Sequence, residues 1–82
     1  MDSPFAPYAD FIRAALRGDS AAQKQAAAAL RKMPDAVADE INVLTADGDL
    51  GDILLEEDGM GGYTVIEDYR EWAETIHAEC RK

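Results

Sequence analysis

A glycine- and acid-rich segment at residues 47–62, DGDLGDILLEEDGMGG, separates two parts of the chain with different apolar patterns. Before it, apolar residues recur every three or four positions, as on one face of a helix. After Gly51 the pattern changes to two short apolar runs, and helical spacing returns from about Glu67. The sequence therefore predicts an α+β fold with the order αααββα, in which a β-hairpin packs against helices.

Two helices are predicted in the first third of the chain. The first begins near Pro7 and ends at Gly18, and its apolar stripe contains Tyr8, Phe11, Ile12, Ala15 and Leu16. The second covers residues 21–32 and stops before Pro34, which cannot continue a helix. Ser20 and Gln23 have the spacing of a capping box, so we expect their side chains to satisfy backbone N–H groups at the start of this second helix.

The remaining elements follow Pro34. A third helix is predicted from Pro34 to about Gly48, with Val37, Ile41 and Leu44 on one face. Residues 53–57 and 63–66 are predicted strands, and because a lone hairpin is marginal in water, one of its faces must lie on the helices. The last helix, residues 67–80, has an apolar side and an opposite acidic stripe of Glu67, Glu71 and Glu74; the apolar side contains Tyr69, Trp72, Ala73, Ile76 and Cys80.

The chain of 82 residues suffices for one small domain over residues 1–82. Cys80 is its only cysteine, which excludes an intrachain disulfide and favours a reducing compartment. The N-terminus has no basic region ahead of an apolar run, and no apolar stretch approaches the roughly 20 residues that span a bilayer. We therefore expect a soluble cytoplasmic protein.

Charge is distributed unevenly along the chain, whose formal net charge is −9. Residues 1–34 contain five basic and three acidic side chains, whereas residues 35–82 contain three basic and fourteen acidic ones. Such a field repels nucleic acid and anionic lipid and attracts basic protein surfaces. An acidic surface that serves only solubility is the alternative.

The acidic segment does not have the register of an EF-hand loop. If such a loop began at Asp47, the fifth, sixth and twelfth positions would be Gly51, Asp52 and Asp58, where an oxygen ligand, a glycine and a bidentate glutamate belong. A looser divalent-metal-binding module within residues 47–58, with Asp47, Asp49 and Asp52 as ligands, stays open as an alternative. No cofactor is expected.

Patterns for phosphate binding and catalysis are not met either. Gly59, Gly61 and Gly62 precede a predicted strand, whereas a phosphate-binding loop normally leads into a helix. His77 and Cys80 lie three residues apart on the last helix, but one histidine and one cysteine do not supply the four ligands of a structural zinc site. The sequence therefore favours a protein that is not an enzyme, and a pocket around His77 and Cys80 would favour the opposite.

The features that remain are acidic patches beside an exposed apolar side chain. The carboxylates would steer association with a basic partner, and Met60 at the tip of the hairpin loop, together with Tyr63, would supply the central contacts. The candidate partner-binding residues are Asp47, Asp49, Asp52, Glu56, Glu57, Asp58, Met60, Tyr63, Glu67, Glu71 and Glu74.

These residues favour an acidic binding protein that docks on a basic protein or nucleoprotein complex and occupies its nucleic-acid track by partial mimicry. In size, domain build and charge the chain resembles small phage-encoded inhibitors such as anti-CRISPR proteins, and also immunity proteins and antitoxins that neutralise a toxin. The resemblance implies an inhibitor or antagonist without catalysis. A homodimer in which Trp72 and the alanines at positions 26–29 meet a second copy stays open as a further alternative.

Overall fold

The computed structural model describes residues 4–48 and 50–80, which form four α-helices and a two-stranded antiparallel hairpin. The predicted α+β fold and its order αααββα are confirmed. Short 3₁₀ turns precede the first and last helices. In chain order the elements are η1 (Ala6–Tyr8), α1 (Ala9–Arg17), α2 (Ser20–Ala29), α3 (Pro34–Asp47), β1 (Leu55–Glu57), β2 (Tyr63–Val65), η2 (Glu67–Tyr69) and α4 (Arg70–Cys80).

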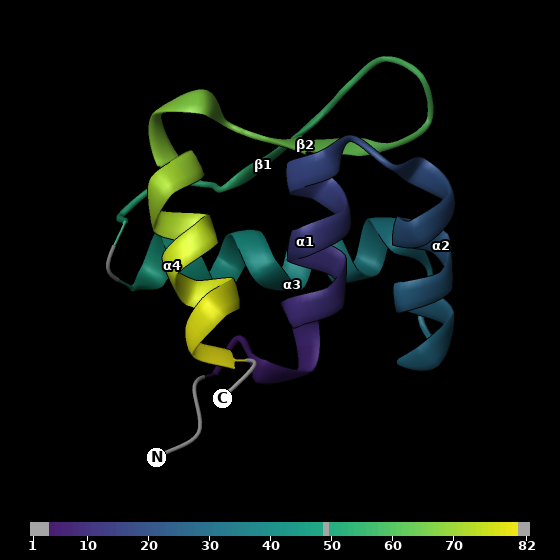
Figure 1. Ribbon diagram of the computed structural model, residues 1–82, viewed down its shortest axis with the longest axis horizontal. Helices are drawn as coiled ribbons and strands as arrows, with labels where there is room; N and C mark the ends of the chain where they lie inside the picture. Colours follow the sequence, from purple (N-terminus) through teal and green to yellow (C-terminus); the bar gives the residue numbers. More distant parts are fainter. Residues whose placement is uncertain (1–3, 49, 81–82) are drawn as a thin grey trace.

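Helix α1 lies at the centre of the fold. It packs between α2 and α4, and its C-terminal half also contacts β2 (Figure 1). Helix α3 crosses behind these three helices, and the hairpin extends over one end of the group (Figure 1). One hairpin face therefore rests on helices, as its marginal stability in isolation requires.

The core is built from the apolar stripes that the sequence predicts. Phe11 and Ile12 of α1 and Ile41 of α3 are fully buried, and Leu54 and Leu55 bring the first hairpin strand into the same cluster. The predicted apolar side of the last helix is also confirmed in the described residues. Ala73 of α4 is fully buried in the core, and Tyr69 of η2 and Trp72 and Ile76 of α4 are partly buried against it. The Trp72 ring meets the Phe5 ring edge to face, with 5.2 Å between ring centroids.

The predicted capping box at the start of α2 is wrong. The N-cap is Asp19, whose Oδ1 accepts a hydrogen bond from the backbone N–H of Ala22 at 3.0 Å. Both Asp19 and Ser20 are good N-cap residues, and the cap one position earlier places Ala22, not Gln23, at the third helical position. The Gln23 side chain is instead buried against the hairpin.

Helix α2 ends earlier than predicted, at Ala29. The N–H groups of Arg31 and Lys32 donate to the carbonyls of Ala28 and Ala27, which is the hydrogen-bond pattern of a Schellman motif. Arg31 occupies the left-handed position of this motif with a φ of 59°, where glycine is normally preferred.

We predict that Arg31→Gly stabilises the protein by about 1 kcal/mol, because glycine removes the steric cost of the left-handed conformation. Urea unfolding would measure the change. Lys24→Gly is the matched control in the interior of the same helix, where glycine should destabilise by about 1 kcal/mol. Equal losses of stability in the two variants would contradict the prediction.

Candidate interaction surface at the hairpin

The hairpin register determines which backbone groups point outward. Leu55 pairs with Val65 and Glu57 with Tyr63, and these pairs alternate with the hydrogen-bonded positions, since Ile66 N–H donates to Leu54 and Asp58 N–H donates to Gly62. In an antiparallel pair, the N–H and C=O of residues between hydrogen-bonded positions point away from the partner strand. The peptide groups of Leu55 and Tyr63 therefore lie on the two outer edges of the hairpin.

Asn42 of α3 satisfies the outer edge of β1. Its Oδ1 accepts hydrogen bonds from the N–H groups of Leu54 and Leu55 at 3.0 and 2.8 Å, and its Nδ2 donates to the Leu55 carbonyl at 3.1 Å. The N–H and the C=O of Leu55 are thus both hydrogen-bonded to one side chain, as they would be to a neighbouring strand.

Gln23 of α2 does the same for β2. Its Nε2 donates to the Tyr63 carbonyl and its Oε1 accepts from the Tyr63 N–H, both at 2.8 Å. The Gln23 side chain is only 1% exposed, so water does not compete for these two hydrogen bonds. The two carboxamides hold the hairpin between α2 and α3, and we refer to Gln23 and Asn42 as the carboxamide clamp.

The loop between the strands is held by Asp58. Its Oδ1 accepts hydrogen bonds from the N–H groups of Met60 and Gly62, at 2.7 and 3.1 Å. Gly62 is buried against the start of α2, where an added Cβ would lie 3.0 Å from the Cβ of Ser20. A side chain at this position would make a contact tighter than ordinary van der Waals packing, so glycine favours the close approach of the loop to the helix. Asp58 therefore orders the loop from within.

Met60 lies at the tip of this ordered loop with 87% of its surface exposed, the largest value among the exposed large apolar residues of the described chain. The sequence prediction of an exposed side chain at this position is confirmed. Its role as a contact to a partner stays a prediction.

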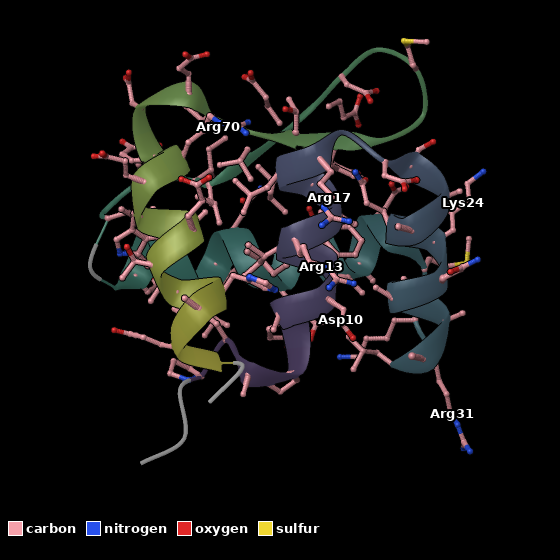
Figure 2. The ribbon with its side chains drawn as sticks, in the orientation of Figure 1. Asp10, Arg13, Arg17, Lys24, Arg31 and Arg70 are labelled. Carbon is pink, nitrogen blue, oxygen red and sulfur yellow. The ribbon has the colours of Figure 1, made fainter. Side chains whose placement is uncertain are left out.

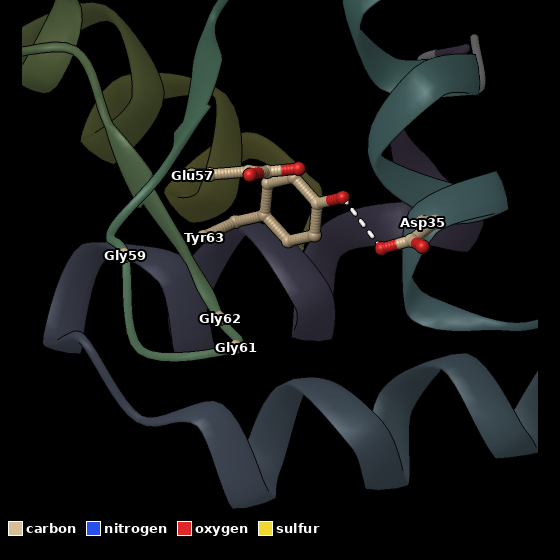
Figure 3. Close-up of a pocket in the computed structure, with 6 residues that line it drawn as sticks. All are labelled: Asp35, Glu57, Gly59, Gly61, Gly62 and Tyr63. Atoms are coloured by element: carbon tan, nitrogen blue, oxygen red, sulfur yellow. Dashed lines mark hydrogen bonds between the residues drawn. The ribbon is translucent and has the colours of Figure 1, made fainter.

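A pocket lies between the hairpin loop and the N-terminal turn of α3, with a cavity volume of about 240 Å³ (Figure 3). Asp35, Glu57 and Tyr63 contribute side chains, and the loop glycines 59, 61 and 62 complete the lining. The Tyr63 hydroxyl donates a hydrogen bond to Asp35 Oδ1 at 2.6 Å, drawn as the dashed line in Figure 3. Among the described residues, no basic side chain lines this pocket.

Tyr63 reports the electrostatic environment of this pocket. Its hydrogen bond to Asp35, its partial burial and the negative charges of Asp35, Glu57 and Asp39 together raise the pKa of Tyr63 to about 12. Three carboxylates therefore act on one phenol, which remains protonated and continues to donate to Asp35 at neutral pH.

The other candidate carboxylates are exposed on several elements. Glu56 and Glu57 project from β1, Asp47 lies at the end of α3, and the acidic stripe is exposed on η2 and α4. Asp52 accepts a hydrogen bond from the Tyr69 hydroxyl at 3.0 Å, which raises the pKa of Tyr69. The predicted site residue Asp49 lies outside the described residues. The candidate carboxylates thus come from several elements, and four of the candidate residues lie in or directly beside the hairpin loop: Glu57, Asp58, Met60 and Tyr63.

Basic side chains are concentrated on the first two helices. Arg13 and Arg17 lie on α1, Lys24 lies on α2, and Arg31 follows the end of α2 (Figure 2). Arg70 of α4 donates a hydrogen bond to the Leu16 carbonyl at the end of α1, at 3.1 Å. Within the described ranges, 4–48 and 50–80, the side chains that form an ion pair are Lys32 and Glu40. Glu40 is not a candidate partner-binding residue, so the N-terminal basic residues do not pair with the described candidate carboxylates.

The structure also describes most of the residues considered for metal or thiol chemistry. No three histidine, cysteine, aspartate or glutamate side chains of the described residues are placed to hold a metal ion. His77 is partly buried on α4, and the side chain of Cys80 lies outside the described part.

Sequence reasoning missed three residues that shape this surface: Gln23, Asn42 and Asp35. Gln23 and Tyr63 are 40 positions apart, and Asp35 and Tyr63 are 28 apart, so no local pattern connects them. A polar residue within the apolar pattern of a helix is the one signal that could have indicated Gln23 and Asn42, since buried polar side chains need partners.

No protein-family model, curated protein or solved structure matches this chain. No helix in the described part of the chain is long and apolar enough to cross a bilayer.

We predict that Gln23→Met destabilises the protein by about 2–4 kcal/mol, because methionine fills a similar volume but leaves the partly buried N–H and C=O of Tyr63 without their protein partners. Urea unfolding would measure the loss. Gln25→Met, on the exposed side of the same helix, is the control and should change stability by less than about 0.5 kcal/mol. Similar stabilities of the two variants would show that the clamp does not hold the hairpin.

We also predict that the Tyr63 hydroxyl titrates near pH 12 and that Asp35→Asn moves this titration towards pH 10, the ordinary value. The folded-state pKa is the higher one, so the stabilising contribution of the hydroxyl is complete below pH 10 and is lost as pH rises towards 12. Carbon-13 NMR of the tyrosine rings would follow the titration, with circular dichroism recorded in parallel to define the folded range.

Glu71→Gln removes the same charge from α4 and is the control for this titration. It should leave the Tyr63 titration unchanged, because Glu71 is not among the groups that act on this phenol. A Tyr63 titration near pH 10 in the parent protein would contradict the hydrogen bond to Asp35.

Proposed function

We propose that this protein is a non-enzymatic binding domain that docks its acidic hairpin loop on a basic protein surface, of the kind that nucleic-acid-binding proteins present to phosphates. The observation that carries the proposal is the 87% exposure of Met60 on a loop whose backbone is held by Asp58. An exposed apolar side chain on an ordered loop resembles a binding anchor, because little conformational freedom remains to be lost on association.

The charges around Met60 support a basic partner. Glu56 and Glu57 are exposed on the adjoining strand, and neither forms an ion pair with a described residue. Unpaired carboxylates around an apolar anchor give the arrangement of many interfaces, in which a central contact supplies affinity and surrounding charges supply steering and specificity. Occupying a basic track would exclude nucleic acid from it, which is the action of an inhibitor.

A photo-cross-linking experiment tests this surface. p-Benzoylphenylalanine would replace Met60 in one variant and Val43, which is 58% exposed on α3, in the other. We predict that position 60 captures a basic, nucleic-acid-binding protein from cells that naturally encode the chain. The yield should fall with added salt, because the screening length shortens from about 10 Å at 0.1 M to about 3 Å at 1 M.

Capture at position 43 in place of position 60 would overturn the proposal, because it would move the docking surface to α3. Capture of an acidic protein at position 60, or a yield insensitive to salt, would equally contradict it. Glu56→Lys with Glu57→Lys, made in the position 60 variant, should lower the yield if the neighbouring carboxylates take part.

A further inference from the structure

The pocket beside the hairpin loop has the composition of a cation site with an aromatic wall. Two carboxylates, from Asp35 and Glu57, and the Tyr63 ring line a cavity of about 240 Å³ (Figure 3). Glu57 and Tyr63 are directly opposite each other on the two strands, at a position where paired side chains lie close together. The hairpin register therefore brings an acid and an aromatic ring to the same wall.

The pocket is built from two separate parts of the chain. Asp35 reaches it from the first turn of α3, and its hydrogen bond to the Tyr63 hydroxyl fixes both side chains. The ring of Tyr63 is also in contact with the buried Phe11 ring, with 6.4 Å between centroids. These contacts hold the aromatic wall in place before any ligand arrives.

The charge of the pocket selects a cation. Asp35, Glu57 and Asp39 all act on the Tyr63 phenol, and the described lining contains no basic group to balance them. These carboxylates would repel an anion and attract a cation. Both Asp35 Oδ2 and the Glu57 carboxylate are without a hydrogen-bond donor among the described residues, so they remain able to accept one.

The size and shape of the pocket favour a guanidinium group. Its volume lies below the roughly 300–1,000 Å³ of sites that enclose drug-sized ligands, which suits the end of one side chain. A planar guanidinium can stack on a tyrosine ring while it donates to carboxylates at its edge, whereas an ammonium has no plane to stack. Arginine therefore fits the three lining side chains better than lysine does.

We propose that this pocket binds the guanidinium group of an arginine side chain. This inference rests on the proposed function, because the arginine belongs to the basic partner. Asp35 and Glu57 accept its hydrogen bonds and the Tyr63 ring stacks on its face. The Met60 loop and the arginine pocket lie side by side, so one partner surface with an arginine next to an apolar hollow engages both.

Titration of the ¹⁵N-labelled protein with N-acetyl-arginine amide tests the pocket directly. The expected result is a set of saturable shifts in the amide signals of Asp35, Gly59, Gly61, Gly62 and Tyr63. N-acetyl-citrulline amide, an uncharged analogue of similar shape, should produce no saturable shifts. Asp35→Asn and Glu57→Gln should each weaken binding by about fivefold, and Glu79→Gln, at an exposed position of α4 away from the pocket, should leave it unchanged.

Equal binding of the citrulline analogue or of N-acetyl-lysine amide would overturn the assignment to guanidinium, as would the absence of shifts in the parent protein. The dispersion of each spectrum shows whether the variant is folded. Because two carboxylate variants are made separately, the test still holds if one of them does not fold. Because this titration contains no partner, its failure concerns the pocket alone, whereas failure of cross-linking at position 60 concerns the docking surface.

Discussion

The fold depends on a clamp made by two carboxamide side chains. Three paired residues on each strand form too small a hairpin to be stable alone. Asn42 and Gln23 pair the outward peptide groups of Leu55 and Tyr63, so α3 and α2 act as neighbours of the hairpin without being strands. Each clamp residue satisfies backbone groups of a strand and also fixes the position of that strand on the helices. Removing either side chain should therefore lower the free energy of unfolding by more than the contribution of one hydrogen bond.

The carboxamide clamp also keeps the hairpin loop ordered. Tyr63, which Gln23 holds, directly follows Gly62, and Gly62 is packed against the start of α2. Asp58 then closes the loop from within, so Met60 is exposed while the backbone on both sides of it is held. Exposure and order together distinguish a binding anchor from a loose turn, because a loose turn would lose much of its binding free energy to ordering.

The sequence predicted what depends on neighbours along the chain and missed what depends on contacts across it. The helical stripe through Phe11 and Ile12, the stop at Gly18 and the exposed Met60 follow from period and turn chemistry. Strand β1 is shorter than predicted and begins at Leu55, although the Leu54 carbonyl still accepts a hydrogen bond from the Ile66 N–H across the hairpin. The role of Gln23 was misread because its local spacing to Ser20 suggested a cap, whereas its two partners lie 40 residues away.

The position of Asp35 explains how the free domain tolerates a pocket with so much negative charge. Asp35 lies in the first turn of α3, where the helix dipole favours an anion, and it accepts a hydrogen bond from Tyr63. Both interactions compensate its charge without a basic residue, and neither occupies its second carboxylate oxygen. The hydrogen-bonding capacity of Asp35 Oδ2 and of the Glu57 carboxylate therefore stays available to a cation that arrives from outside.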